Sequence, residues 1–262
     1  MLFNLFSNKP RIFFMHIPKT GGTSMRIAIQ KHYGNQNYYE LDPQRTQIMA
    51  RLIYQSVPCV KQEKYIFRDS FILDAMEQDV PFVTGHAHFN QQIWERHSQR
   101  YAYVTLLRDP VKRYISHYFF DASKKEGEHA YLNTSLPELI KTDKGIKRGH
   151  LYLNYFSGFS IERKYDLTRI PERIEIAKQN LLKFNFVGFL EDLEDFKLRF
   201  KQQFGLRLTI PHSNKNTVTK PKVEPQILEE IQEICQPDIE IYNFAKSHLS
   251  KNTGSTGLGV LD

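Results

Sequence analysis

The chain has 262 residues, which suits one large domain, and we predict a single α/β domain over residues 1–249 followed by a flexible tail at 250–262. It has 36 lysines and arginines against 29 aspartates and glutamates, and the net charge of +7 favours anionic partners such as nucleotides or acidic glycans. Two cysteines exclude a disulfide framework, and without a long apolar run no transmembrane helix is expected, so we predict a cytoplasmic protein.

Buried strands are predicted where apolar and aromatic residues run together, and helices where apolar residues recur on one side. The predicted strands are 11–17, 38–41, 81–84, 101–107 and 186–190. The predicted helices, after one that follows the first strand, are 44–55, 69–78, 111–122, 136–140, 147–156, 171–182, 193–204, 225–235 and 237–249. This alternation predicts a central parallel sheet with helices on both faces and a ligand site at the carboxyl ends of its strands.

The segment that follows the first strand has the composition of an anion-binding loop. Two glycines permit a tight turn and a close approach of the backbone to a ligand. Thr23 or Ser24 can cap the next helix, whose N-terminal N–H groups and dipole favour an anion. The residues predicted to hold a phosphate or sulfate are Lys19, Thr20, Gly21, Gly22, Thr23 and Ser24.

This loop is not a Walker A motif, in which the lysine follows the last glycine. Lys19 precedes both glycines here, so a kinase-type phosphate loop fits poorly. An ordinary strand–turn–helix with a solvated lysine remains the alternative for this loop taken alone.

A second anion site is predicted where the strand 101–107 runs into a helix. Arg108 leaves the strand end, and Ser116 follows eight residues later on the helix. A guanidinium fork and a hydroxyl together can hold a phosphate in one orientation. For this pair alone, a local pairing of Arg108 with Asp109 is the competing interpretation.

Taken together, the two segments resemble the sulfotransferases that use 3′-phosphoadenosine 5′-phosphosulfate (PAPS). HIPKTGGTS resembles their 5′-phosphosulfate loop, and RDPVKRYISHY resembles their 3′-phosphate motif, with Arg108 and Ser116 at the matching positions. TGHAHF and FVGFLEDLEDF are further similar stretches, and the resemblance is strongest to the heparan sulfate 2-O branch of the carbohydrate enzymes. Unlike that branch, this chain is expected to lack a membrane anchor, since it has no long apolar run.

The resemblance implies in-line transfer of a sulfuryl group from PAPS to a hydroxyl acceptor, a carbohydrate or another small metabolite, with an anionic acceptor as one option. Lys19 would neutralise the leaving group, and the 3′-phosphate would be held by Arg108 and Ser116. His86 is the predicted catalytic base, since it follows Gly85 at a strand end, and His88 is its rival.

Several alternatives stay open at this stage. The loop 212–222 either folds over the nucleotide, with Lys215 on a phosphate, or is an ordinary basic loop. His86 and His88 have no acidic or cysteine neighbour, so no metal is expected. A nucleotide kinase-like phosphoryl transferase and a non-catalytic basic module that binds acidic polymers are the competing functions, while no nucleic-acid motif is present and the oligomeric state is unknown.

Overall fold

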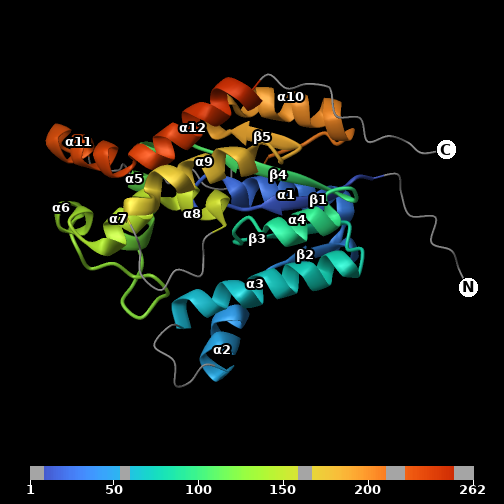
Figure 1. Cartoon of the computed structure of the whole chain (residues 1–262), viewed down its shortest axis with the longest axis horizontal. Coiled ribbons are helices and arrows are strands. Elements are labelled where there is room, and N and C mark those ends of the chain that lie inside the picture. The colour runs from blue at the N-terminus through green and yellow to red at the C-terminus, as the bar shows by residue number, and fades with distance from the viewer. Residues whose placement is uncertain (1–8, 54–59, 159–166, 211–221, 251–262) are drawn as a thin grey trace, which may run out of the picture.

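The computed structural model describes residues 9–53, 60–158, 167–210 and 222–250, and the account below concerns these residues. Five parallel strands form one sheet in the order β2-β3-β1-β4-β5. The strands are β1 (Arg11–Met15), β2 (Tyr38–Glu40), β3 (Phe82–Gly85), β4 (Tyr101–Leu107) and β5 (Phe186–Phe189). The predicted α/β class with an all-parallel sheet is therefore confirmed (Figure 1).

Twelve α-helices and three short 3-10 turns connect and cover these strands in the described residues. The helices are α1 (Gly22–Tyr33), α2 (Pro43–Ile53), α3 (Val60–Glu77), α4 (Gln91–His97), α5 (Pro110–Ala122), α6 (Leu136–Ile140), α7 (Asp143–Gly149), α8 (Leu151–Ser157), α9 (Ile170–Leu181), α10 (Leu193–Phe204), α11 (Pro225–Ile234) and α12 (Gln236–Leu249). The 3-10 turns are η1 (Asn35–Asn37), η2 (Leu167–Arg169) and η3 (Leu190–Asp192).

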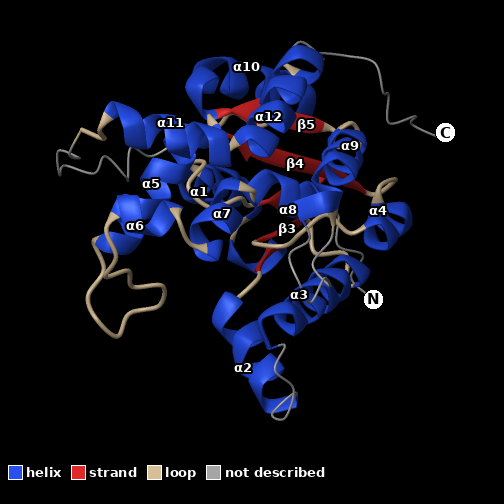
Figure 2. Cartoon of the chain, turned by 60° about the vertical axis from the view of Figure 1, so that its left-hand side comes forward, coloured by secondary structure: helices blue, strands red, loops and turns tan. Residues whose placement is uncertain are grey.

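Alternating side chains of the central strand β1 supply two separate cores. Ile12 and Phe14 pack with residues of α1 and α10. Phe13 and Met15 point to the opposite face, where they pack with residues of α3, α8, α9 and α12. Since successive strand residues face opposite sides, a continuous apolar strand is what a sheet covered on both faces requires. Figure 2 shows this layering, with α2 projecting from the body of the molecule beside α3.

Most predicted elements are found within a residue or two of their expected bounds, and two helices differ more. β1 ends at Met15, so His16 and Ile17 belong to the loop. α3 begins at Val60, well before the expected start at residue 69. The single helix expected over 147–156 is two helices, α7 and α8, which meet at His150.

A distant carboxylate explains the break at His150. Asp238 accepts hydrogen bonds from the backbone N–H groups of Tyr152 and Leu153, at 2.9 Å each. An acceptor at this position caps a new helix start, as an N-cap side chain would do locally. Asp238 lies on α12, so Gly149, directly before His150, is the local feature of residues 147–156 that accompanies the break.

Within the described residues, no helix combines the length and the apolar character needed to cross a membrane. Residues 251–262 lie outside the described part of the chain, so the domain boundary and the predicted tail stay predictions, as does the predicted compartment.

Gly188 provides a test of the core. A Cβ at this position of β5 would overlap the Phe196 ring of α10, which packs directly on the strand. We expect Gly188→Ala to lower the free energy of unfolding by about 1–3 kcal/mol, the usual cost of overpacking a core. Urea denaturation measures this loss, with Lys201→Ala, on an exposed position of α10, as the control. A Gly188→Ala protein as stable as the parent would contradict the packing described here.

Candidate functional site

The loop between β1 and α1 is turned by two residues with left-handed backbone angles. Lys19 has φ 67° and Gly21 has φ 85°. Gly21 is the N-cap of α1, and within the described residues no side chain caps this helix, so the expected capping by Thr23 or Ser24 is wrong. A helix start without a side-chain cap presents its N–H groups and positive dipole end to an anion.

Thr20 stabilises the turn of this loop. Its hydroxyl donates to the carbonyl of Ile17 at 2.9 Å, and the side chain is fully buried. Thr20 was predicted to hold an anion, but its side chain forms a hydrogen bond within the loop.

The His16 ring lies against the start of α1 and was not singled out from the sequence. A Cβ on residue 22 would overlap this ring, so only glycine fits there. His16 thereby joins the end of β1 to the first turn of the helix. The feature of the sequence that could have indicated this role is a histidine between the apolar residues Met15 and Ile17, shortly before the glycine loop.

His86 lies beside His16 because the two strands that precede them end at the same level. Met15 of β1 is paired with Gly85 of β3 in the register of the sheet. The His86 Nδ1 is 2.6 Å from the backbone oxygen of His16, and the two rings lie 4.3 Å apart between centroids. A carbonyl can only accept, so Nδ1 carries the proton and donates it, which leaves the lone pair of a neutral ring on Nε2.

Burial keeps this ring neutral. The pKa of His86 is lowered from 6.5, mainly by burial and partly by the charge of Arg68, against the opposing effects of the His16 carbonyl and Glu40. Arg68 of α3 also donates to the His86 carbonyl at 2.7 Å. A neutral, oriented imidazole with its lone pair on Nε2 is the form that can accept a proton at neutral pH.

His88, the rival histidine, occupies a different environment. Its ring is stacked on Tyr65 at 4.0 Å and lies edge-on to Tyr155 at 5.0 Å. Burial is the main cause that lowers the pKa of His88 to about 3, and its Nδ1 has no hydrogen-bond partner in the described residues. His88 therefore packs between tyrosine rings, and its Nδ1 lacks the carbonyl partner that fixes the tautomer of His86.

Arg108 brings the two predicted anion motifs together. Its Nη1 donates to the carbonyl of Lys19 at 3.2 Å, across two neighbouring strands of the sheet. The pKa of Arg108 is lowered from 12.5 mainly by burial. Ser116 lies on α5, which begins two residues after Arg108, and is largely buried. The carboxyl edge of the sheet thus gathers Lys19, His86 and Arg108, as the strand ends predicted.

The side chain of Lys19 reaches α5, where it lies over an aromatic ring. Its Nζ is 3.5 Å from the centre of the Phe120 ring, an arrangement in which ring and cation attract each other. Phe120 is 43% exposed and is the one exposed phenylalanine among the described residues. Sequence reasoning missed Phe120, since an aromatic residue in an amphipathic helix is ordinarily part of a core.

A further histidine, His117, lies near Lys19. His117 of α5 is 3.6 Å from the carboxylate of Asp121. Its pKa is lowered to about 2 by burial, followed by the charges of Arg148, Arg113, Lys19 and Lys124. Although the pairing with a carboxylate is typical of a base, the surrounding cations make His117 a poor proton acceptor.

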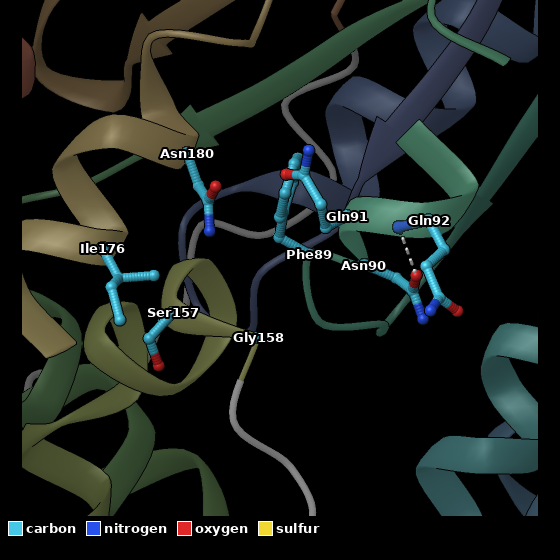
Figure 3. A pocket seen from close by; sticks show the side chains of 8 residues that line it. All are labelled: Phe89, Asn90, Gln91, Gln92, Ser157, Gly158, Ile176 and Asn180. Atoms are coloured by element: carbon cyan, nitrogen blue, oxygen red, sulfur yellow. Dashed lines mark hydrogen bonds between the residues drawn. The ribbon is translucent and has the colours of Figure 1, made fainter. Parts of the chain in front are cut away.

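A separate hollow of about 410 Å³ lies between α4, α8 and α9 (Figure 3). Its lining includes carboxamide groups at Asn90, Gln92 and Asn180. None of the predicted site residues lines it, so it is distinct from the edge that carries Lys19 and Arg108.

Two predictions concern groups that the structure cannot place. Lys215 and most of the loop 212–222 lie outside the described residues. No cluster of three or more potential metal ligands occurs among the residues that are described, and the metal-free scheme stays a prediction.

Comparison with known proteins adds an independent line of evidence. Residues 4–245 match the family model described as "Sulfotransferase family". The chain is also similar to heparan-sulfate 6-O-sulfotransferase 2 of Gallus gallus, with 25% identity over 277 residues that cover 90% of this chain and 66% of the relative.

Two further relatives match over shorter stretches. Heparan-sulfate 6-O-sulfotransferase 2 of Danio rerio is 26% identical over a stretch that covers 57% of this chain and 38% of the relative. Heparan-sulfate 6-O-sulfotransferase 1 of Homo sapiens is 26% identical over a stretch that covers 58% of this chain and 44% of the relative. The chain thus spans between about a third and two thirds of these relatives. These relatives are named as 6-O enzymes. The comparisons therefore support a relationship to the carbohydrate branch, but not the specific resemblance to the 2-O enzymes that the motifs predicted.

The burial of His88 predicts a specific dependence of stability on pH. A histidine whose pKa is lower in the folded than in the unfolded protein binds more protons when unfolded, so stability is present above the unfolded pKa and is lost as the pH falls. For His88 the loss begins near pH 6.5 and extends toward the folded value of about 3. The slope is roughly 1.4 kcal/mol per pH unit for one such group.

His88→Phe keeps an aromatic ring between Tyr65 and Tyr155 and removes the titrating group. We expect the free energy of unfolding of this variant to fall less steeply between pH 6.5 and pH 5 than that of the parent, by urea denaturation. Parallel curves for the two proteins would show that His88 titrates alike in both states.

Proposed function

This chain belongs to the sulfotransferase family, and from that premise we propose that it transfers a sulfuryl group from PAPS to a hydroxyl group of a carbohydrate. The observation that carries the proposal is the hydrogen bond from Arg108 Nη1 to the Lys19 carbonyl. It joins the two predicted anion-binding motifs at one edge of the sheet, where the first would hold a 5′-phosphosulfate and the second a 3′-phosphate of the same nucleotide. A single anion motif would not distinguish PAPS from nucleotides that lack a 3′-phosphate.

On the donor side, the start of α1 would hold the 5′-phosphosulfate. Gly21, Gly22, Thr23 and Ser24 bring backbone N–H groups and the helix dipole to this point. The Lys19 ammonium would neutralise the phosphate oxygen that leaves when its bond to sulfur breaks. Arg108 and Ser116 would hold the 3′-phosphate, with a guanidinium fork as the group that selects for it.

On the acceptor side, His86 would act as the base. Its Nε2 takes the proton of the acceptor hydroxyl while the hydroxyl oxygen attacks sulfur, and 3′,5′-diphosphoadenosine leaves. The hydrogen bond from Nδ1 to the His16 carbonyl stabilises the imidazolium that forms. Fixing the ring this way also aims Nε2 before the acceptor arrives, which lowers the cost of reorganisation.

The relatives support a saccharide as the acceptor class. Their names describe 6-O transfer to heparan sulfate. Because the chain spans only part of their lengths, the acceptor and the whole reaction are proposals for this protein. A sugar hydroxyl at an exocyclic position, as in 6-O transfer, is the first acceptor to test.

The competing function is phosphoryl transfer from ATP. It shares the loop, yet it gives no role to Arg108 and Ser116, since ATP has no 3′-phosphate. The two functions are therefore separated by the nucleotide that the protein prefers.

We expect the protein to bind 3′,5′-diphosphoadenosine much more tightly than ADP, ATP or AMP, by isothermal titration calorimetry. Arg108→Ala should weaken binding of 3′,5′-diphosphoadenosine at least about tenfold, since a hydrogen bond to a charged group contributes on the order of 1.5–3 kcal/mol. Ser116→Ala should weaken it less, and both variants should change AMP binding little. Preference for ATP, or equal losses for both nucleotides, would rule out the 3′-phosphate assignment.

We expect His86→Asn to lower the turnover number by roughly 10²–10⁴-fold while the affinity for 3′,5′-diphosphoadenosine is kept. The asparagine amide can still donate to the His16 carbonyl, so the variant removes the base and retains the local hydrogen bond. In the parent, activity should fall on the acid side below pH 6.5, because burial lowers the pKa of His86. Turnover is measured by transfer of labelled sulfate from PAPS to a heparan-type oligosaccharide.

His88→Phe is the matched control for this experiment. It replaces the histidine two residues further along the chain and leaves His86, directly after β3, unchanged. A large loss of turnover in His88→Phe with little loss in His86→Asn would move the role of base to His88.

A further inference from the structure

We propose that Tyr152 is a positioning residue for the donor nucleotide, acting through Arg108. The inference rests on the proposed function and adds a residue that neither motif contains. Tyr152 lies on α8, 44 positions along the chain from Arg108, and its side chain is fully buried. It would set the place of the guanidinium that recognises a 3′-phosphate.

The hydroxyl of Tyr152 makes two hydrogen bonds, both to the backbone of Arg108. It accepts from the Arg108 N–H at 2.8 Å and donates to the Arg108 carbonyl at 2.6 Å. At this position β4 has ended and α5 has not begun, so neither the sheet nor the helix satisfies these backbone groups. One buried hydroxyl therefore decides where the backbone of Arg108 lies.

Tyr152 is itself held in place from behind. Its backbone N–H donates to Asp238, and the guanidinium of Arg113 lies over its ring at 5.4 Å from the centroid. Arg113 also faces Asp238 at 3.4 Å, with both side chains fully buried. The ring thus has one fixed position from which its hydroxyl reaches the strand end.

A second contact holds the same turn from the other side. Glu191 of η3 accepts from the N–H of Asp109 at 2.9 Å, and Tyr242 donates to the other carboxylate oxygen of Glu191 at 3.0 Å. Two successive backbone N–H groups after β4 are therefore satisfied by side chains from other elements. Such double support is expected where a functional side chain must be held accurately.

The effect of this support extends beyond Arg108 to the phosphate loop. The guanidinium of Arg108 donates to the carbonyl of Lys19, a residue whose left-handed backbone is unfavourable for a side chain other than glycine. If Arg108 were displaced, its guanidinium would lose its hydrogen bonds to both the 3′-phosphate and this carbonyl. Tyr152 thereby links recognition of the 3′-phosphate to the geometry of the loop that carries Lys19.

The test removes one oxygen atom. We expect Tyr152→Phe to weaken binding of 3′,5′-diphosphoadenosine about three- to tenfold by calorimetry, the range of one or two neutral hydrogen bonds, with a smaller effect on AMP. Tyr103→Phe is the matched control. It also deletes a buried hydroxyl, on β4 itself, but that hydroxyl has no hydrogen-bond partner in the described residues, so both affinities should stay at the parent values.

A double-mutant cycle shows whether Tyr152 acts through Arg108. In the Arg108→Ala background, Tyr152→Phe should cause no further loss of affinity for 3′,5′-diphosphoadenosine. Glu191→Ala, which removes the second contact to the turn, should reproduce the preferential loss by an independent route. Binding is compared at a temperature at which circular dichroism shows every variant to be folded.

Unchanged affinity in Tyr152→Phe, equal losses for both nucleotides, or a loss that persists undiminished in the Arg108→Ala background would each overturn the inference. Failure of the proposed function looks different, because the parent protein would then show no preference for 3′,5′-diphosphoadenosine over AMP. A parent that has this preference, together with an unaffected Tyr152→Phe, would refute the role of Tyr152 alone.

Discussion

The hydrogen bond from Arg108 to the Lys19 carbonyl is the contact on which the site depends. It connects the ends of β1 and β4, and each of its partners has support of its own. The carbonyl belongs to a residue with a left-handed backbone, and the guanidinium extends from a backbone held by Tyr152. Because parallel neighbouring strands end on the same side of the sheet, two motifs far apart in the sequence meet at one edge.

Burial of histidines is the second constraint at this edge. His16, His86 and His88 all have lowered pKa values, with burial as the largest cause. The shared cause has different consequences, because the neighbours differ. His86 has a carbonyl that fixes its tautomer, whereas His88 lies between tyrosine rings. The environment of each ring, and not its residue type, therefore separates a candidate base from a histidine that packs among aromatic rings.

The surroundings of Lys19 show how a cationic site is maintained in a folded protein. Lys19 lies over Phe120, and the carboxylate of Asp121 on the same helix accepts from both Arg148 and Lys124. Counter-charges and an aromatic face reduce the repulsion among these cations. An anionic donor would supply further negative charge at this edge, which agrees with the proposed use of PAPS.

The sequence by itself determined the fold class and the candidate loops, because strand hydrophobicity, glycine turns and strand-end charges are local patterns. It predicted the five strands and most of the helices along the chain, and it indicated Lys19, His86 and Arg108 as candidate site residues at strand ends. It did not reveal the break at His150, the ring of His16 on Gly22 or the hydroxyl of Tyr152 on Arg108. Each of these depends on a partner distant in the chain, such as Asp238 for the helix break. Only the tertiary structure decided them, since packing brings such partners together and a local pattern carries no record of them.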